Sequence, residues 1–259
     1  MKKIISILTI VFISINVFAQ TNMIIRITDN STISVPISAI DSVYYEELQN
    51  CGTVTDIDGN EYPTIIIGSQ CWMAEDLKVT LYPNGDLIPN VRDDTDWDNL
   101  EDNNTDDAYC CYNNDNTTDY GGLYTYAAAI GDNWERDNAD GQGVCPDGWH
   151  LPTDAEWTTL TDNLGGTNIA GGKMKEIGTI HWNSPNEGAD NSSGFSALPN
   201  GLRDYNGSFH YLGVNGRWWS ATEYGSGTAY LRLLPGSSAE INNNGSMKQN
   251  GFSVRCVRD

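Results

Sequence analysis

The chain has 259 residues, of which 35 are acidic and 14 are basic, so its formal net charge at pH 7 is -21. Binding to nucleic acid or to anionic lipid needs clustered Lys and Arg. The negative electrostatic field of this chain repels both of these partners. We therefore exclude nucleic acid as a partner, whereas cations, neutral glycans and proteins remain compatible.

Residues 1–19 have the features of a secretory signal peptide. Lys2 and Lys3 precede an apolar run at residues 4–18, and Val17 and Ala19 are small residues of the kind that signal peptidase accepts. Removal of this segment changes the charge to -21 - 2 = -23. The run is too short for a permanent membrane span and no other segment is comparable. We expect a secreted or periplasmic protein, or one held at the cell surface, without stable membrane insertion.

Six cysteines in an exported chain favour disulfide bonds over metal ligands or catalytic thiols, although many pairings are open. None lies near the expected cleavage site, so lipid attachment is not expected. The three histidines, His150, His181 and His210, are not at zinc-ligand spacing with a cysteine, which disfavours a structural zinc site. The cysteines are Cys51, Cys71, Cys110, Cys111, Cys145 and Cys256.

Residues 20–50 are predicted to form a small β-rich segment. Two β-branched runs, at residues 23–28 and 32–36, flank Asp29-Asn30-Ser31, which has the residue types of a hairpin turn. A further strand is expected at residues 43–45.

Gly, Asn, Asp and Trp become frequent from residue 51 onward and predict turn-rich structure around large aromatic anchors. A hairpin is expected from residues 54–57 and 62–67, because Asp58-Gly59-Asn60 between them readily supplies the positive φ angles of a tight turn. Residues 71–78 are then expected to bring a tryptophan and Leu77 into the core.

Residues 93–119 contain ten acidic side chains and no basic one, which predicts a surface loop that cannot bury itself. Asp94, Asp96 and Asp98 alternate there, as in a calcium-binding loop, but Thr105 stands where an EF-hand places its bidentate Glu. We therefore expect no cofactor, with a looser calcium site at these three aspartates as the alternative.

The clearest predicted helix begins after Thr153, because Glu156 follows at the spacing of a capping box and Trp157 and Leu160 repeat at helical spacing. Gly165-Gly166 is expected to end it. Shorter helices are expected at residues 125–129 and 171–176.

Six spaced motifs occur in an order that resembles one protein family. They are residues 54–60 (VTDIDGN), 70–77 (QCWMAEDL), 143–153 (GVCPDGWHLPT), 194–199 (GFSALP), 218–223 (WWSATE) and 251–257 (GFSVRCV). Residues 51–259 thus resemble the Fibrobacter succinogenes major paralogous domain (FISUMP) family, which is common in exported Bacteroidetes and Fibrobacteres proteins. The resemblance implies an α+β, C-type lectin-like domain of twisted antiparallel strands, two short helices and long loops, following the small N-terminal β-hairpin. It implies no settled biochemical activity.

The same resemblance implies a disulfide between Cys145 and Cys256, because the fold commonly ties the region before its first helix to its last strand. The other four cysteines are expected to pair among themselves and to hold the acidic segment through Cys110, Cys111 or both. The Glu-Pro-Asn and Trp-Asn-Asp triplets of calcium-dependent sugar-binding lectins are absent. Formylglycine-generating enzymes share the broad fold but use paired cysteines near the C-terminus, where Cys256 stands alone, so that activity is not carried over.

Trp218 and Trp219 suggest sugar stacking, although neighbouring strand residues point to opposite faces, so at most one ring could stack on a ligand while the other packs in the core. Packing in the core or sheet is the favoured interpretation of the pair. The surface candidates around them, in Gly-punctuated loops, are Arg203, Asp204, Tyr205, Asn206, Arg217, Glu223, Tyr224 and Tyr230.

No specific catalytic constellation is present, and His150 is interpreted as a hydrogen-bonded structural residue. We therefore predict an exported, non-catalytic binding or adhesion module that presents loops to a glycan or protein. The alternatives are a structural surface or scaffold domain and an uncharacterised enzyme.

Overall fold

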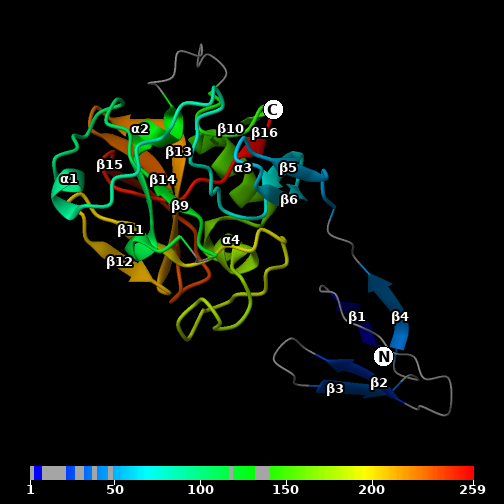
Figure 1. Cartoon of the computed structure of the whole chain (residues 1–259). Coiled ribbons are helices and arrows are strands. Elements are labelled where there is room, and N and C mark those ends of the chain that lie inside the picture. The colour runs from blue at the N-terminus through cyan, green and yellow to red at the C-terminus, as the bar shows by residue number, and fades with distance from the viewer. Residues whose placement is uncertain are drawn as a thin grey trace. The chain divides into compact units, whose positions relative to one another are not determined.

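A computed structural model describes residues 49–116, 119–131 and 141–259 with their side chains, and residues 3–7, 22–26, 32–36 and 40–45 as backbone strands. The chain divides into two compact units, Met1–Leu48 and Gln49–Asp259, both drawn in Figure 1.

The N-terminal unit contains short paired strands. β2 (Asn22–Arg26) and β3 (Thr32–Pro36) pair antiparallel, which confirms the hairpin expected from the β-branched runs. β4 (Ile40–Tyr45) begins earlier than expected and pairs in parallel with β1 (Lys3–Ile7). Most of the predicted signal peptide lies outside the described residues, and its cleavage stays a prediction.

The C-terminal unit consists mainly of short antiparallel strands with a few short helices, in agreement with the α+β class (Figure 1). Its helices are α1 (Asp94–Asp98), the 3-10 helix η2 (Tyr112–Asn114), α2 (Tyr126–Ile130), α3 (Asp154–Asn163) and α4 (Thr167–Met174). In the part of the chain that the structure describes, no helix has the length and apolar character to cross a membrane.

Its strands form several small sheets. A five-stranded sheet has the order β10-β16-β7-β6-β5, a three-stranded sheet has the order β13-β14-β15, and β11-β12 and β8-β9 are two-stranded. The strands are β5 (Thr53–Thr55), β6 (Glu61–Ile67), β7 (Gln70–Met73), β8 (Tyr109–Cys111), β9 (Gly122–Tyr124), β10 (Trp149–His150), β11 (Asn200–Arg203), β12 (Phe209–Leu212), β13 (Asn215–Gly225), β14 (Thr228–Pro235), β15 (Asn242–Met247) and β16 (Val257–Arg258).

Local sequence explains the first hairpin of this unit. β5 and β6 pair antiparallel around a turn in which Gly59 has a φ of +87°. The Asp56 carboxylate accepts hydrogen bonds from the Asn60 backbone N–H at 2.9 Å and from the Tyr62 hydroxyl at 2.6 Å. The turn is therefore fixed by one buried carboxylate as well as by glycine.

The predicted capping box is present at the start of α3. The Thr153 hydroxyl accepts from the Glu156 backbone N–H, and the Glu156 carboxylate accepts from the Thr153 backbone N–H at 2.8 Å. Trp157 and Leu160 are buried on the inner face of the helix. α3 is therefore specified by its own residues.

The other two predicted helices are present with shifted bounds. Thr125 caps α2 by accepting from Ala128 N–H. α4 begins at Thr167, four residues before the expected start, and includes Gly171 and Gly172. A Cβ on Gly171 would lie 2.1 Å from the Glu240 carbonyl oxygen, so these glycines serve close backbone packing.

Strand β13 is covered on both faces by hydrophobic core. Trp219 packs against Phe252, with ring centroids 4.4 Å apart, and against Tyr126 at 5.5 Å. Trp218 points to the opposite side and packs edge-on against Phe195 at 6.1 Å. Both indole rings are fully buried, so neither of them can stack on a sugar. Their inclusion among the ligand-binding candidates is wrong, because the strand lies between two cores rather than at a surface.

A fully buried ion pair lies beside the Trp218 ring. Asp76 Oδ1 accepts from Arg255 Nε and from Trp218 Nε1, both at 2.8 Å, and Asp76 Oδ2 accepts from Asn200 Nδ2 at 3.0 Å. Arg255 also donates to the Phe195 carbonyl and stacks over the Phe195 ring. Four of the six spaced motifs contribute a side chain or a carbonyl to this one network, so the fold brings distant motifs together in one place.

Four of the six cysteines form disulfides. Cys145 is bonded to Cys256, as the resemblance implied, and closes a loop of 111 residues, an arrangement worth about 4 to 5 kcal/mol in the chain-entropy model. Cys51 is bonded to Cys71. Cys110 and Cys111 are free, so the expectation that they hold the acidic segment is wrong. Successive residues of β8 point to opposite sides, and Cys110 is buried while Cys111 is half-buried.

The acidic segment also buries more than expected. Trp97 and Cys110 are fully buried in a small core with Tyr112 and Leu123. Basic and amide side chains from distant strands fix the segment to the rest of the unit. Most of its described residues are exposed or partly exposed, in agreement with a surface segment, but composition alone does not reveal the few buried anchors or the cations supplied from elsewhere in the fold.

Candidate functional site

Arg203 is a structural residue rather than a surface ligand. Its guanidinium is fully buried, donates to the Val91 carbonyl at 2.6 Å and forms an ion pair with Asp94 at 2.8 Å. It also stacks over the Trp97 ring at 4.3 Å. Arg203 thus anchors the acidic segment, and its prediction as a ligand-binding residue is wrong.

Glu223 forms an ion pair within the protein, with Lys248. Its carboxylate accepts from Lys248 Nζ at 2.6 Å, and Lys248 is buried and also donates to Asn104 Oδ1 at 2.7 Å. The hydrogen bond from Lys248 lowers the pKa of Glu223. Glu223 therefore joins the end of β13 to the acidic segment, although its side chain is half exposed.

Asp204 and Asn206 shape the turn between β11 and β12. Asp204 Oδ1 accepts from the Tyr205 backbone N–H, and Asn206 Oδ1 accepts from the Ser208 backbone N–H, both at 2.9 Å. Tyr205 between them is 44% exposed, and its carbonyl accepts from Gln249. Of these three candidates, Tyr205 is the one whose side chain offers aromatic surface to solvent.

The three calcium candidates do not converge. Asp94, Asp96 and Asp98 lie within the short helix α1, where residues two apart point in different directions. Asp94 is already paired with Arg203. Among the residues that the structure describes, no group of three or more His, Cys, Asp or Glu side chains could hold a metal ion. The aspartates were expected in a loop, and their helical geometry rules out the convergence that the alternative required.

Tyr224 and Tyr230 form the clearest exposed aromatic feature. Tyr224 is 62% exposed, and its ring meets that of Tyr230 edge-on, with centroids 5.0 Å apart and an interplanar angle of 88°. The Tyr224 ring lies on Gly245 of β15, where a Cβ would stand 2.6 Å from its Cδ1 atom. The absence of a side chain at Gly245 therefore allows the Tyr224 ring to pack against β15.

Asn243 extends the same face of the sheet. β14 and β15 pair Tyr230 with Gly245 and Arg232 with Asn243, so these side chains share one face. Asn243 Nδ2 donates to Asp154 at 2.8 Å, which fixes the exposed amide beside the rings. We call Tyr224, Tyr230, Asn243 and Gly245 the tyrosine surface. Sequence reasoning found its tyrosines but missed Asn243 and Gly245, because strand register is needed to place them.

His150 is held between two carboxylates. Nε2 lies 2.7 Å from Glu156 Oε1, and Nδ1 lies 2.7 Å from Asp259 Oδ1. The hydrogen bond with Glu156, and then that with Asp259, raises the pKa of His150 against the effect of partial burial. The pKa of Glu156 is lowered: burial alone would raise it, but His150 and the Thr153 cap outweigh that effect. The ring thus links α3 to the chain next to β16, as a structural residue would.

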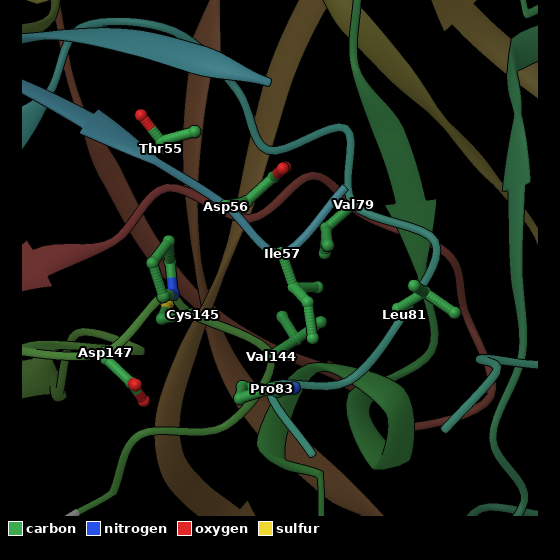
Figure 2. Close-up of a pocket in the computed structure, with 10 residues that line it drawn as sticks. Thr55, Asp56, Ile57, Val79, Leu81, Pro83, Val144, Cys145 and Asp147 are labelled. Atoms are coloured by element: carbon green, nitrogen blue, oxygen red, sulfur yellow. The ribbon is translucent and has the colours of Figure 1, made fainter. Parts of the chain in front are cut away.

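A small open pocket of about 260 Å³ lies beside the Cys145–Cys256 disulfide, below the size of most ligand pockets (Figure 2). Its two carboxylates are engaged, Asp56 in the β5–β6 turn and Asp147 with Gln142 Nε2 at 3.1 Å. It therefore offers a shallow, mixed surface rather than convergent reactive groups. The lining residues are Thr55, Asp56, Ile57, Val79, Leu81, Pro83, Val144, Cys145, Pro146 and Asp147.

Comparison with known proteins gives one family. The family model described as Fibrobacter succinogenes major domain matches residues 65–258, which is most of the chain and includes every strand from β7 onward. That description names no activity. No curated protein matches, and no solved structure matches.

Proposed function

The chain belongs to the Fibrobacter succinogenes major domain family, and we propose that it is an exported, non-catalytic binding module whose tyrosine surface contacts a neutral glycan. We also propose a C-type lectin-like fold for residues 51–259. The disulfide between the segment before α3 and the last strand supports that fold, as do the short helices and the long connections between strands.

The tyrosine surface carries the glycan proposal. Aromatic rings pack on the apolar face of a pyranose, and a fixed amide can hydrogen-bond to its hydroxyl groups. Tyr224 offers a largely exposed ring, Tyr230 braces it, and Asn243 lies on the same face. Lys and Arg are not exposed within this surface, so a neutral sugar fits it better than an anionic one.

The state of the polar residues supports a non-catalytic role. Asp76, Arg255, Glu156 and His150 are among the residues that an enzyme could use, and each is engaged in a contact that joins two elements of the fold. The pocket beside the disulfide is small and its carboxylates are occupied. A binding role needs none of these groups to be free.

The test is a glycan array followed by calorimetry on the purified protein. We expect neutral oligosaccharides to bind, Tyr224→Ala to weaken binding about tenfold, and a calcium chelator to have no effect. Tyr205→Ala is the matched control, because it removes another exposed tyrosine outside the tyrosine surface. Gly245→Ala is the sharper variant, since its methyl group would displace the Tyr224 ring while leaving every tyrosine in place.

Two outcomes would overturn the proposal. One is the absence of any neutral glycan signal from the folded protein, which would favour a scaffold role. The other is binding that Tyr224→Ala and Gly245→Ala leave unchanged.

A further inference from the structure

Arg217 differs from the other inward-facing basic residues of the described chain. Arg203, Arg232, Lys248 and Arg255 each form an ion pair with a carboxylate. The fully buried Lys175 instead donates to three backbone carbonyl oxygens. Within the described ranges Arg217 has neither arrangement, although the chain contains 35 acidic residues.

The guanidinium of Arg217 keeps donors that its surroundings do not use. When the Asn215 amide is turned so that its oxygen faces the guanidinium, Nη2 can donate to that oxygen at 3.3 Å. Nη1 is buried and has no hydrogen-bond partner among the described residues, as is also true of Nη1 of the ion-paired Arg232. Burial lowers the Arg217 pKa to about 10, and Tyr211 and Asp204 are the titratable groups that act on it through space. A guanidinium matches a carboxylate through two parallel hydrogen bonds, and Nη1 of Arg217 is a donor that is still available for one of them.

Tyr211 covers this guanidinium. Arg217 Cζ lies 4.7 Å from the centre of the Tyr211 ring, yet the tyrosine is 52% exposed, and its other ring contact is the exposed His210 at 5.9 Å. A side chain that is about half exposed can turn without opening a hydrophobic core.

The backbone of Tyr211 is strained to put the ring there. Its φ is +63°, a left-handed conformation that costs a non-glycine residue about 1 kcal/mol or more. The residue opposite it in the β11–β12 hairpin is Gly201, with a φ of +65°. Two opposite residues of the hairpin thus have a positive φ, and one of them is a tyrosine, for which this conformation is strained. Backbone strain of this kind is often found at functional positions.

We infer that Arg217 binds a single carboxylate on an otherwise neutral sugar, with the Tyr211 ring turning aside to pack on the sugar face. The planar fork of the arginine receives the carboxylate, and the ring supplies the apolar contact. The net charge of -21 opposes polyanions, so one acidic sugar unit fits better than a polyuronate.

The test compares glucuronic acid with its methyl ester, which has nearly the same shape but no charge, by NMR titration of the purified protein. We expect the acid to bind at least about tenfold more tightly than the ester, and Arg217→Gln to remove that difference. Arg258→Gln is the control, because Arg258 is an exposed arginine of β16.

Tyr211→Gly keeps the test informative if Arg217→Gln destabilises the fold. Glycine takes the positive φ without strain, so this variant should melt no lower than the wild type. Because it lacks the ring, it should bind the acid more weakly than the wild type but should keep the preference for the acid over the ester. Equal affinity for acid and ester would overturn the site, as would equal binding by a folded Arg217→Gln protein. Preference for a peptide C-terminal carboxylate over glucuronate would overturn the sugar class. Tyr224→Ala should leave glucuronate binding unchanged. The proposal for Arg217 can therefore be tested separately from the proposal that the tyrosine surface binds a neutral glycan.

Discussion

Replacement of Asp76 by asparagine is expected to destabilise the C-terminal unit strongly. The carboxylate accepts two hydrogen bonds from Arg255, one from Trp218 and one from Asn200. An amide of the same shape keeps one acceptor oxygen for Arg255 and Trp218, but it turns an NH₂ group toward Asn200 Nδ2 and leaves the buried guanidinium charge uncompensated. Removal of one partner of a buried pair costs about 3–5 kcal/mol. For a unit of this size that corresponds to a fall in melting temperature of roughly 6–20 °C.

Equilibrium unfolding in guanidinium chloride measures the change directly. Asp162→Asn on the exposed side of α3 is the matched control, with an expected change within about 0.5 kcal/mol. A double variant, Asp76→Leu with Arg255→Met, should be less destabilised than the sum of its single changes, because it removes both charges. If Asp76→Asn costs less than about 1 kcal/mol, the pair is not the centre of the core that its geometry indicates.

Two further changes probe the histidine link and the free thiols. Because the pKa of His150 is raised in the folded protein, its contribution to the free energy of unfolding is complete below pH 6.5 and is lost as pH rises through the folded pKa. Because the pKa of Glu156 is lowered, the contribution of Glu156 is complete above pH 4.5 and is lost as pH falls through its folded pKa. The melting-temperature difference between wild type and His150→Gln should therefore peak between these values, and a flat difference from about pH 5 to about pH 9 would contradict this. Alkylation of the native protein should modify Cys111 slowly and Cys110 only after unfolding, because burial raises the Cys110 pKa to about 12. A Cys110–Cys111 disulfide in a peptide map would contradict the free thiols.

Features set by neighbouring residues were predictable from the sequence. The capping box at Thr153 and Glu156 joins residues three positions apart and needs no tertiary partner, and the structure confirms it. The turn at Gly59 depends in the same way on local conformational freedom. The Cys145–Cys256 bond was predictable for a different reason, since resemblance to a family supplies a pairing that composition leaves open.

Features set by strand order were not predictable. Alternation along β13 correctly separates Trp218 from Trp219, but it does not say that both faces of this strand meet a core. Likewise, the sequence around Arg203 is rich in turn residues, while its guanidinium extends back to Asp94, 109 residues away. Burial of a residue near a loop depends on what the distant chain brings to it, and one sequence does not show that.

The residues of the candidate sites show the same difference between features set by neighbouring residues and features set by strand pairing. Tyr224 and Tyr230 were found because exposed aromatic residues near glycine are visible in sequence, whereas Asn243 enters through the register of β15. Tyr211 was missed because its positive φ is a property of a paired hairpin position opposite Gly201.

The family motifs and the proposed binding residues occupy different parts of the molecule. Asp76, Trp218 and Arg255 from three motifs meet in one buried network, and Glu223, from the same motif as Trp218, forms an ion pair with Lys248. Side chains that are engaged in internal hydrogen bonds and ion pairs stabilise the fold and are not available to bind a ligand. The proposed binding residues lie outside the motifs, and Tyr224 lies one residue beyond the motif that ends at Glu223. Membership of the family therefore does not by itself identify a ligand of this chain.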